Sequence, residues 1–195
     1  MHKLMIILGS VRQGRVGLPV AEWALHSAKS DGRFQVDFVD LVDLALPLMD
    51  EPNHPRLRQY VHEYTKEWSC SVEAADSFLF VFPEYNHSYS PGIKNAIDYL
   101  HAEWARKPVG FINWGGNSGG TRAQAALRPV VASLGMVMTQ GNIEISMPLY
   151  RIEDGVFDPS ERQSAVLQAQ LDDLLALSSA LQPRGKPGHP SMSQR

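Results

Sequence analysis

Short apolar runs that end abruptly at a glycine or a proline are the feature of this 195-residue sequence that most limits its fold. These runs are residues 3–8, 78–82 and 109–114, which are followed by Gly9, Pro83 and Gly115. A strand that is apolar along its whole length is typical of a parallel sheet with helices on both faces, because neither of its faces meets water. Weaker strands are expected at residues 35–39 and 136–139.

Apolar residues at helical spacing fill the intervals between these strands. The predicted helical stripes begin at Val20, Leu57, Ile93, Ala126 and Leu167. Ser90 and Pro91 have the residue types favoured at the start of a helix, and Pro129 is expected to bend or break the helix that contains it. This alternation of strands and helices predicts an α/β fold, namely a doubly wound five-stranded parallel sheet.

The segments outside this alternation set the predicted domain limits. Residues 40–55 contain three prolines and are predicted to form a long ordered loop over the sheet. Residues 183–195 are rich in proline, glycine and serine, which is typical of a disordered tail. We therefore expect a single domain over residues 1–182.

Composition excludes several classes of function. The net charge of -3 gives no basic excess for general binding to nucleic acid. Cys70 is the single cysteine, so neither an internal disulfide nor a cysteine-rich metal site is expected. No apolar stretch approaches the length of a membrane span, and a cytoplasmic location is the expectation.

The loop after the first strand, residues 9–17, has the features of a phosphate site. Its glycines match neither the GxGxxG spacing nor a Walker A loop. It does offer the Ser10 hydroxyl, the cations Arg12 and Arg15, and a tight turn at Gly14, directly before a predicted helix. A helix N-terminus and arginine both favour phosphate, although a solvated turn with two surface arginines fits the same residues.

Two further loops follow the third and fourth predicted strands. Residues 83–92 contain two tyrosines and an asparagine, which suit a planar ligand but also suit a rigid connection. Residues 114–121 contain four glycines, which allow the backbone to approach a ligand closely. In a sheet of the flavodoxin-like order 2-1-3-4-5, all three loops lie at one edge, where such sheets bind ligands.

These loops together resemble the NAD(P)H-dependent FMN reductase family, whose members are flavodoxin-like quinone, azo, chromate and flavin reductases. The resemblance covers roughly residues 3 to 140. The motifs that carry it are Gly9-Ser10-Val11-Arg12 with Arg15, Pro83-Glu84-Tyr85-Asn86 continuing from Ser90 to Tyr99, and Gly115-Gly116-Asn117-Ser118-Gly119-Gly120.

The resemblance implies bound FMN, with NADPH or NADH as co-substrate and a small-molecule electron acceptor. Ser10, Arg12, Gly14, Arg15 and Val16 are then expected to hold the FMN phosphate. Pro83, Glu84, Tyr85 and Asn86 would line the isoalloxazine, and Gly116, Asn117, Ser118 and Gly119 would touch its far side. No side chain is predicted to act as a catalytic acid or base, because the cofactor carries the chemistry.

The implied reaction is a two-step exchange. Hydride passes from the nicotinamide to FMN N5 and then to a quinone, an azo compound or a free flavin. A flavin-bound electron carrier or redox sensor with little turnover is the alternative, and a phosphate-ester enzyme that uses only the first loop is a third reading. The resemblance also implies a homodimer or homotetramer. Dimerisation is expected from the residues as well, because a monomer would leave the aromatic side chains of Tyr99, His101 and Trp104 exposed to water.

Overall fold

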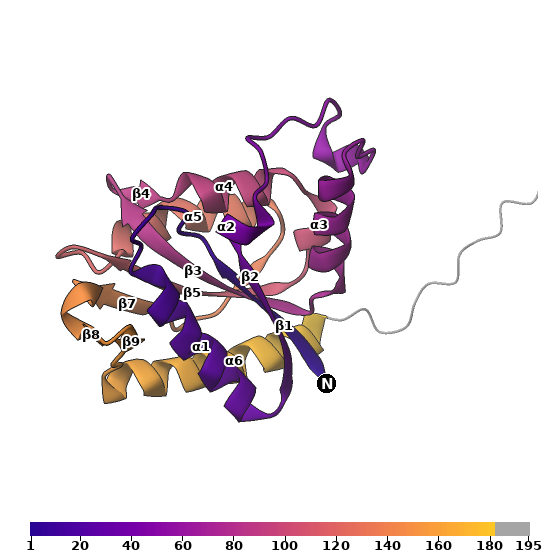
Figure 1. Ribbon diagram of the computed structural model, residues 1–195. Helices are drawn as coiled ribbons and strands as arrows, with labels where there is room; N and C mark the ends of the chain where they lie inside the picture. Colours follow the sequence, from indigo (N-terminus) through magenta and orange to yellow (C-terminus); the bar gives the residue numbers. More distant parts are fainter. Residues whose placement is uncertain (182–195) are drawn as a thin grey trace, which may run out of the picture.

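The computed structural model describes residues 1–181, in which a central sheet is covered by helices on both faces (Figure 1). The strands of the main sheet are β1 (His2–Leu8), β2 (Phe34–Asp40), β3 (Ser77–Tyr85), β4 (Ser88–Tyr89), β5 (Pro108–Gly115), β6 (Val137–Met138) and β7 (Ile143–Ser146). The α-helices are α1 (Gly17–Asp31), α2 (Leu41–Leu44), α3 (Glu63–Ala74), α4 (Pro91–Asp98), α5 (Thr121–Ser133) and α6 (Glu161–Leu181). The tail predicted at residues 183–195 lies outside the described residues.

The predicted α/β fold is confirmed, and the predicted strand order is matched in part. The order along the sheet is β2-β1-β3-β5-β6, with every neighbouring pair parallel. This is the expected 2-1-3-4-5 arrangement of parallel strands, but the sheet is seven-stranded because two more strands join it. The short β4 pairs antiparallel with the end of β3, and β7 pairs parallel with β5.

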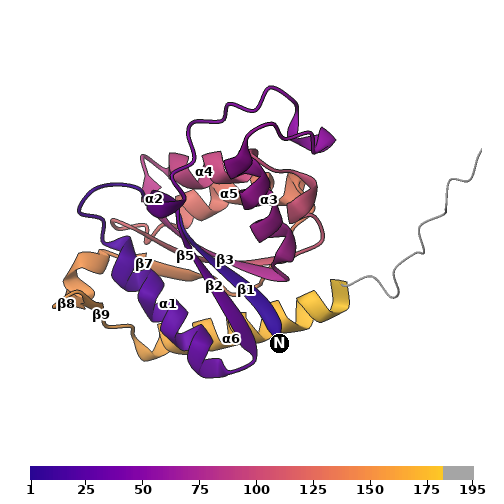
Figure 2. The ribbon, with the colours of Figure 1, turned by 45° about the vertical axis from the view of Figure 1, so that its right-hand side comes forward.

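Alternate residues of the central strands enter two separate hydrophobic layers. On β1, Leu4, Ile6 and Leu8 face the layer covered by α1 and α6, whereas Met5 and Ile7 face the layer covered by α3, α4 and α5. Both views of the ribbon show α1 and α6 together on one side of the sheet (Figures 1 and 2). These strands are apolar throughout because both of their faces are buried.

The fifth position of the sheet is divided between two strands, which differs from the single strand predicted at residues 136–139. β6 pairs with Pro108 and Val109, and β7 pairs with β5 from Ile112 onward. Between the ends of β6 and β7, Gln170 of α6 donates through Nε2 to the backbone oxygens of Phe111 and Gly141. The side chain of Gln170 therefore takes over part of the ladder where the backbone of the fifth strand leaves it.

The helices differ from their predicted form at three places. α5 continues through Pro129 without a break. α3 begins only at Glu63, because the preceding residues form a 3-10 turn, η1 (Pro55–Leu57), and then loop. Ser90 precedes α4 as expected, but its hydroxyl donates to the backbone oxygen of Gly9, 2.5 Å away, and does not cap the helix.

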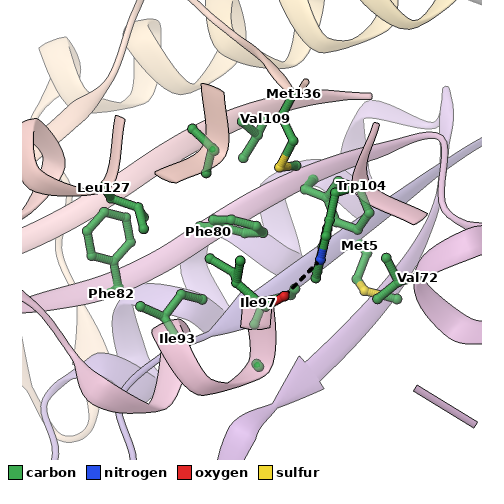
Figure 3. Close-up of a cluster of buried hydrophobic side chains, with 14 of the residues drawn as sticks. Met5, Val72, Phe80, Phe82, Ile93, Ile97, Trp104, Val109, Leu127 and Met136 are labelled. Atoms are coloured by element: carbon green, nitrogen blue, oxygen red, sulfur yellow. Dashed lines mark hydrogen bonds between the residues drawn. The ribbon is translucent and has the colours of Figure 1, made fainter. Parts of the chain in front are cut away.

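Two of the three residues expected to favour self-association are fully buried, and the third, His101, is half-buried. Tyr99 and Trp104 are each 0% exposed, and Trp104 donates from its indole nitrogen to the Ile97 oxygen inside the core (Figure 3). The 3-10 helix η2 (Ala102–Trp104) turns this indole back against Phe78 and Phe80. These two rings therefore give no reason for a dimer, because a single chain already buries both of them.

Candidate functional site

A cavity of about 390 Å³ lies at the carboxyl ends of the central strands. It is lined by Ser10, Arg12, Arg15, Val16, Pro83, Glu84, Tyr85, Trp114, Gly115, Gly116, Met147, Pro148, Leu149 and Tyr150. These residues come from the segments that follow β1 and β7, from the end of β3, and from the end of β5 with the residue after it. The order of the sheet brings these four segments, far apart in sequence, to the same edge (Figure 1).

The first loop presents unpaired donors at one end of this cavity. α1 begins at Gly17 with no side chain capping its free N–H groups and with no acidic residue in its first turn. Arg12 is exposed, and within residues 1–181 its guanidinium has no hydrogen-bond or ion-pair partner. A free guanidinium beside an uncapped helix N-terminus is an arrangement that favours a phosphate group.

Arg15 has a different environment from Arg12. Its guanidinium forms a bidentate ion pair with Asp40 at the end of β2, and Nη1 also donates to the Ser10 backbone oxygen. The two side chains are only 15% and 8% exposed. Arg15 thus ties the first loop to the neighbouring strand end, and most of its hydrogen-bonding capacity is used within the protein.

The second loop is linked to the first loop through a pair of hydroxyl groups. Tyr85 at the end of β3 places its phenol oxygen 3.2 Å from Ser10 Oγ, and both residues line the cavity. Ser10 is only 2% exposed, so this contact lies at the bottom of the cleft. The ring of Tyr85 and the buried edge of Trp114 give the cavity aromatic walls.

Glu84 joins the second loop to the third. Its carboxylate accepts hydrogen bonds from Ser118 Oγ at 2.9 Å, from the Arg122 backbone N–H at 3.1 Å and from Arg122 Nε at 2.7 Å. Burial alone would raise the pKa of Glu84, but the bonds from Ser118 and Arg122 outweigh burial and hold this pKa below its ordinary value. The carboxylate is therefore committed to bracing the two loops.

The structure brings eight of the thirteen predicted site residues to the cavity wall. These eight are Ser10, Arg12, Arg15, Val16, Pro83, Glu84, Tyr85 and Gly116. The other five do not line it, and they are Gly14, Asn86, Asn117, Ser118 and Gly119. Gly14 takes a left-handed turn with φ of 65°, and Asn86 lies at the exposed tip of the β3–β4 hairpin with φ of 47°. The cofactor contacts predicted for all thirteen residues stay predictions.

The structure also adds wall residues that the sequence analysis missed. These are Met147 to Tyr150, which follow β7 and enter the 3-10 helix η3 (Pro148–Arg151), whereas Trp114 and Gly115 belong to the third predicted loop. A usable signal was present, since Ile143 and Ile145 alternate with polar residues and mark a strand whose following residues reach the same edge. The family resemblance ended at about residue 140 and drew no attention to this segment.

The cavity fits a ligand that has a phosphate at one end and a flat ring at the other. Arg12 and the free N–H groups of α1 supply the anion-binding end. Tyr85, Trp114 and Leu149 supply apolar surface. A Cβ atom added at Gly116 would meet nothing closer than Met147 Cε at 3.9 Å, so the backbone there is open to a ring. FMN has this combination of groups, and the residues present suit it.

A metal site does not compete with this interpretation. Within residues 1–181, no three His, Cys, Asp or Glu side chains lie close enough together to hold a metal ion.

In the same part of the chain, no helix combines the length and the apolar character that crossing a bilayer requires.

Comparison with known proteins gives concordant results. The model of the family described as NADPH-dependent FMN reductase matches residues 2–147. An NAD(P)H-dependent FMN reductase of Schizosaccharomyces pombe is 36% identical over 160 residues, which cover 81% of this chain and 80% of that protein. A 2-hydroxy-1,4-benzoquinone reductase of a Burkholderia species is 32% identical over 187 residues, with coverage of 89% and 94%.

A solved structure supports the fold. The flavoenzyme NAD(P)H:(acceptor) oxidoreductase FerB from Paracoccus denitrificans superposes with a TM-score of 0.73 at 24% identity. The match covers 92% of this chain and 98% of that one.

Proposed function

Because the chain belongs to the NADPH-dependent FMN reductase family and is an FMN-dependent NAD(P)H oxidoreductase, we propose that the cavity at the carboxyl ends of β1, β3, β5 and β7 is its FMN site. One observation carries this proposal. The unpaired guanidinium of Arg12 and the uncapped N-terminus of α1 lie beside a cleft that has aromatic walls.

We assign the binding roles by the chemistry of each wall. Arg12 and the first N–H groups of α1 hold the phosphate, and Ser10 adds a hydroxyl donor at the bottom of the cleft. Pro83, Tyr85 and Gly116 line the ring. The chemistry that FMN supplies when bound is two-electron transfer, from NAD(P)H and on to an acceptor.

Arg15 and Glu84 have positioning roles in this proposal. Arg15 holds the first loop against Asp40, and Glu84 holds the second loop against Ser118 and Arg122. Both side chains fix the shape of the cleft through contacts within the protein, so the loops are ordered before the cofactor arrives. Preorganised loops reduce the entropy lost when a ligand binds.

We propose a quinone as the electron acceptor. The support is the similarity to a benzoquinone reductase together with the apolar wall of Leu149 and Tyr150. One open cleft serves first the nicotinamide and then the acceptor, which is the two-step exchange expected of such a site.

Self-association and a cytoplasmic location are also proposed. The support for a homodimer or homotetramer is a group of exposed apolar residues on the segment after β2, where Val42, Leu48, Leu57 and Val61 are 44%, 85%, 58% and 50% exposed. Sedimentation that finds only a 21.7 kDa species at micromolar concentration would refute self-association.

The cofactor proposal is tested with apo protein. Titration into FMN is expected to quench flavin fluorescence with one FMN bound per chain, and the loaded protein is expected to oxidise NAD(P)H with benzoquinone. Protein that takes up no FMN and oxidises no NAD(P)H would overturn the proposal. Rapid turnover with benzoquinone would also exclude the electron-carrier alternative.

A further inference from the structure

Four residues after β7 form an exposed wall at the mouth of the cavity. This wall, called the lip below, consists of Met147, Pro148, Leu149 and Tyr150. Leu149 is 65% exposed and Tyr150 is 85% exposed, while Pro148 beneath them is buried. Large apolar side chains held in water next to a binding cavity suggest a surface that a ligand covers.

The lip is anchored where it leaves the sheet. The Met147 N–H donates to the Gly115 oxygen at 2.9 Å, and the Tyr150 N–H donates to the Met147 oxygen at 3.1 Å. Met147 also has a φ of 47°, in the left-handed region that residues with a side chain seldom occupy. This turn directs the chain from β7 toward Gly116, where Met147 Cε lies 3.9 Å from the position that a Cβ would take.

The lip is also anchored where it returns to the protein. It is followed by a hairpin of β8 (Ile152–Glu153) and β9 (Val156–Phe157). Phe157 packs on Trp23 of α1 with ring centroids 5.4 Å apart, and Arg151 Nε donates to the Asp158 oxygen at 2.8 Å. The lip is thus a short strap with both ends fixed, so its exposed side chains are held beside the cleft.

We propose that Leu149 and Tyr150 are the residues that recognise the electron acceptor, by packing against one face of a flat quinone ring. This inference rests on the proposed function and deepens it. A tyrosine ring and an aliphatic side chain favour a planar apolar partner. A small hydrophilic anion has no flat apolar face to pack against these side chains, so the lip favours quinones over acceptors of that class.

The test uses the FMN-loaded protein and a binding measurement without turnover. Calorimetry with anthraquinone-2-sulfonate, in the absence of NAD(P)H, gives the Kd of a planar quinone. Tyr150→Ala and Leu149→Ala are each expected to raise this Kd about tenfold, whereas Tyr150→Phe keeps it within about twofold. Val156→Ala is the matched control, because Val156 is 68% exposed on β9, in the hairpin that follows the lip, but does not line the cavity.

Kinetic measurements distinguish an effect on the acceptor from an effect on the reduction of the flavin by NADPH. With Tyr150→Ala, KM for benzoquinone is expected to rise, and this rise is expected to exceed any change in turnover with ferricyanide or in the rate of flavin reduction by NADPH. A flavin-reduction rate that falls as much as quinone binding would assign the lip to the nicotinamide and overturn the proposal. An unchanged quinone Kd in both alanine variants would overturn it as well.

The remaining outcomes are also decisive. If Tyr150→Ala changes the sedimenting mass and leaves the quinone Kd unchanged, the lip is a contact between copies of this chain, and the proposal is wrong. Leu149→Ala provides a second variant if Tyr150→Ala does not fold. Wild-type protein that fails to bind FMN would refute the proposed function itself, which distinguishes that failure from failure of the lip.

Discussion

Arg12 and Arg15 lie three residues apart in one loop, yet their surroundings give them different tasks. Arg12 is free at the cavity wall, and Arg15 is engaged with Asp40 and the Ser10 backbone. A sequence motif does not distinguish the two arginines, because either guanidinium could bind a phosphate. The position of Asp40 at the end of the adjacent strand decides which cation is available.

The free cation leads to a prediction about cofactor affinity. Arg12→Ala is expected to weaken FMN binding by about 30-fold, because one or two charge-assisted hydrogen bonds to the phosphate are lost. Fluorescence titration of apo protein measures this change. Arg162→Ala, which removes an exposed arginine on α6, is the control and should bind FMN as the wild type does. Equal affinity of Arg12→Ala and wild type would contradict the assignment.

The paired cation leads to a prediction about stability. Arg15→Met leaves the nearly buried Asp40 without its partner, and we expect the free energy of unfolding of the apo protein to fall by about 3 kcal/mol. Adding Asp40→Asn removes the uncompensated charge, so the double variant should recover part of the loss. Urea unfolding of the single and double variants measures both effects. A double variant no more stable than Arg15→Met would count against the ion pair as the cause.

At the scale of elements, three carboxylates fasten the long segment between α2 and α3. Asp50 accepts hydrogen bonds from Tyr64 and Tyr99, and Glu51 accepts them from two backbone N–H groups. Glu103 accepts hydrogen bonds from Tyr60 and Ser69 and lies 3.2 Å from Arg58 Nε. This segment is therefore ordered by its own carboxylates, Asp50 and Glu51, and by Glu103 of η2, as well as by its own prolines.

The carboxylates make this segment sensitive to acid. Burial alone would raise the pKa of Glu103, but its hydrogen bonds outweigh burial and hold the pKa below the ordinary value of 4.5. The pKa of Asp50 is lowered as well, mainly by the Tyr64 hydroxyl. A pKa lower in the folded state means that the stabilisation is complete above the ordinary value and is lost as the pH falls below it.

The expected result is a free energy of unfolding that decreases as the pH drops below about 4.5. Glu103→Gln should be less stable than wild type at pH 7 but should lose less on acidification, because one of the titrating groups is gone. Urea unfolding at a series of pH values gives the slope of the free energy of unfolding against pH for the wild type and for Glu103→Gln. Glu161→Gln at the exposed start of α6 is the control and should keep the wild-type slope. An unchanged slope in Glu103→Gln would refute the role of this carboxylate.

At the scale of the whole molecule, cofactor binding and folding are linked, because the cavity wall comes from four separate strand ends. A ligand that binds only the folded state at 100 times its Kd stabilises that state by about 2.7 kcal/mol. We therefore expect FMN to raise the Tm by about 8 °C. Riboflavin lacks the phosphate, so at the same concentration it should raise the Tm much less. Differential scanning fluorimetry measures both, and equal shifts would contradict the phosphate site.

The sequence by itself determined the fold class and the family. Apolar runs that end in glycine or proline are local signals, and so are the helical stripes between them. The loop after β3, residues 83–92, could also be identified from the sequence, because its motif is a local signal too. Eight of the predicted site residues line the cavity because parallel strands necessarily bring their carboxyl ends to one edge.

Only the tertiary structure decided what depends on residues distant in sequence. The division of the fifth strand depends on Gln170, which reaches the sheet from a helix about thirty positions later. The burial of Trp104 depends on Phe78 and Phe80, the task of Arg15 depends on Asp40, and the lip enters the site because β7 pairs with β5. Each of these follows from packing between elements, which local residue patterns do not encode.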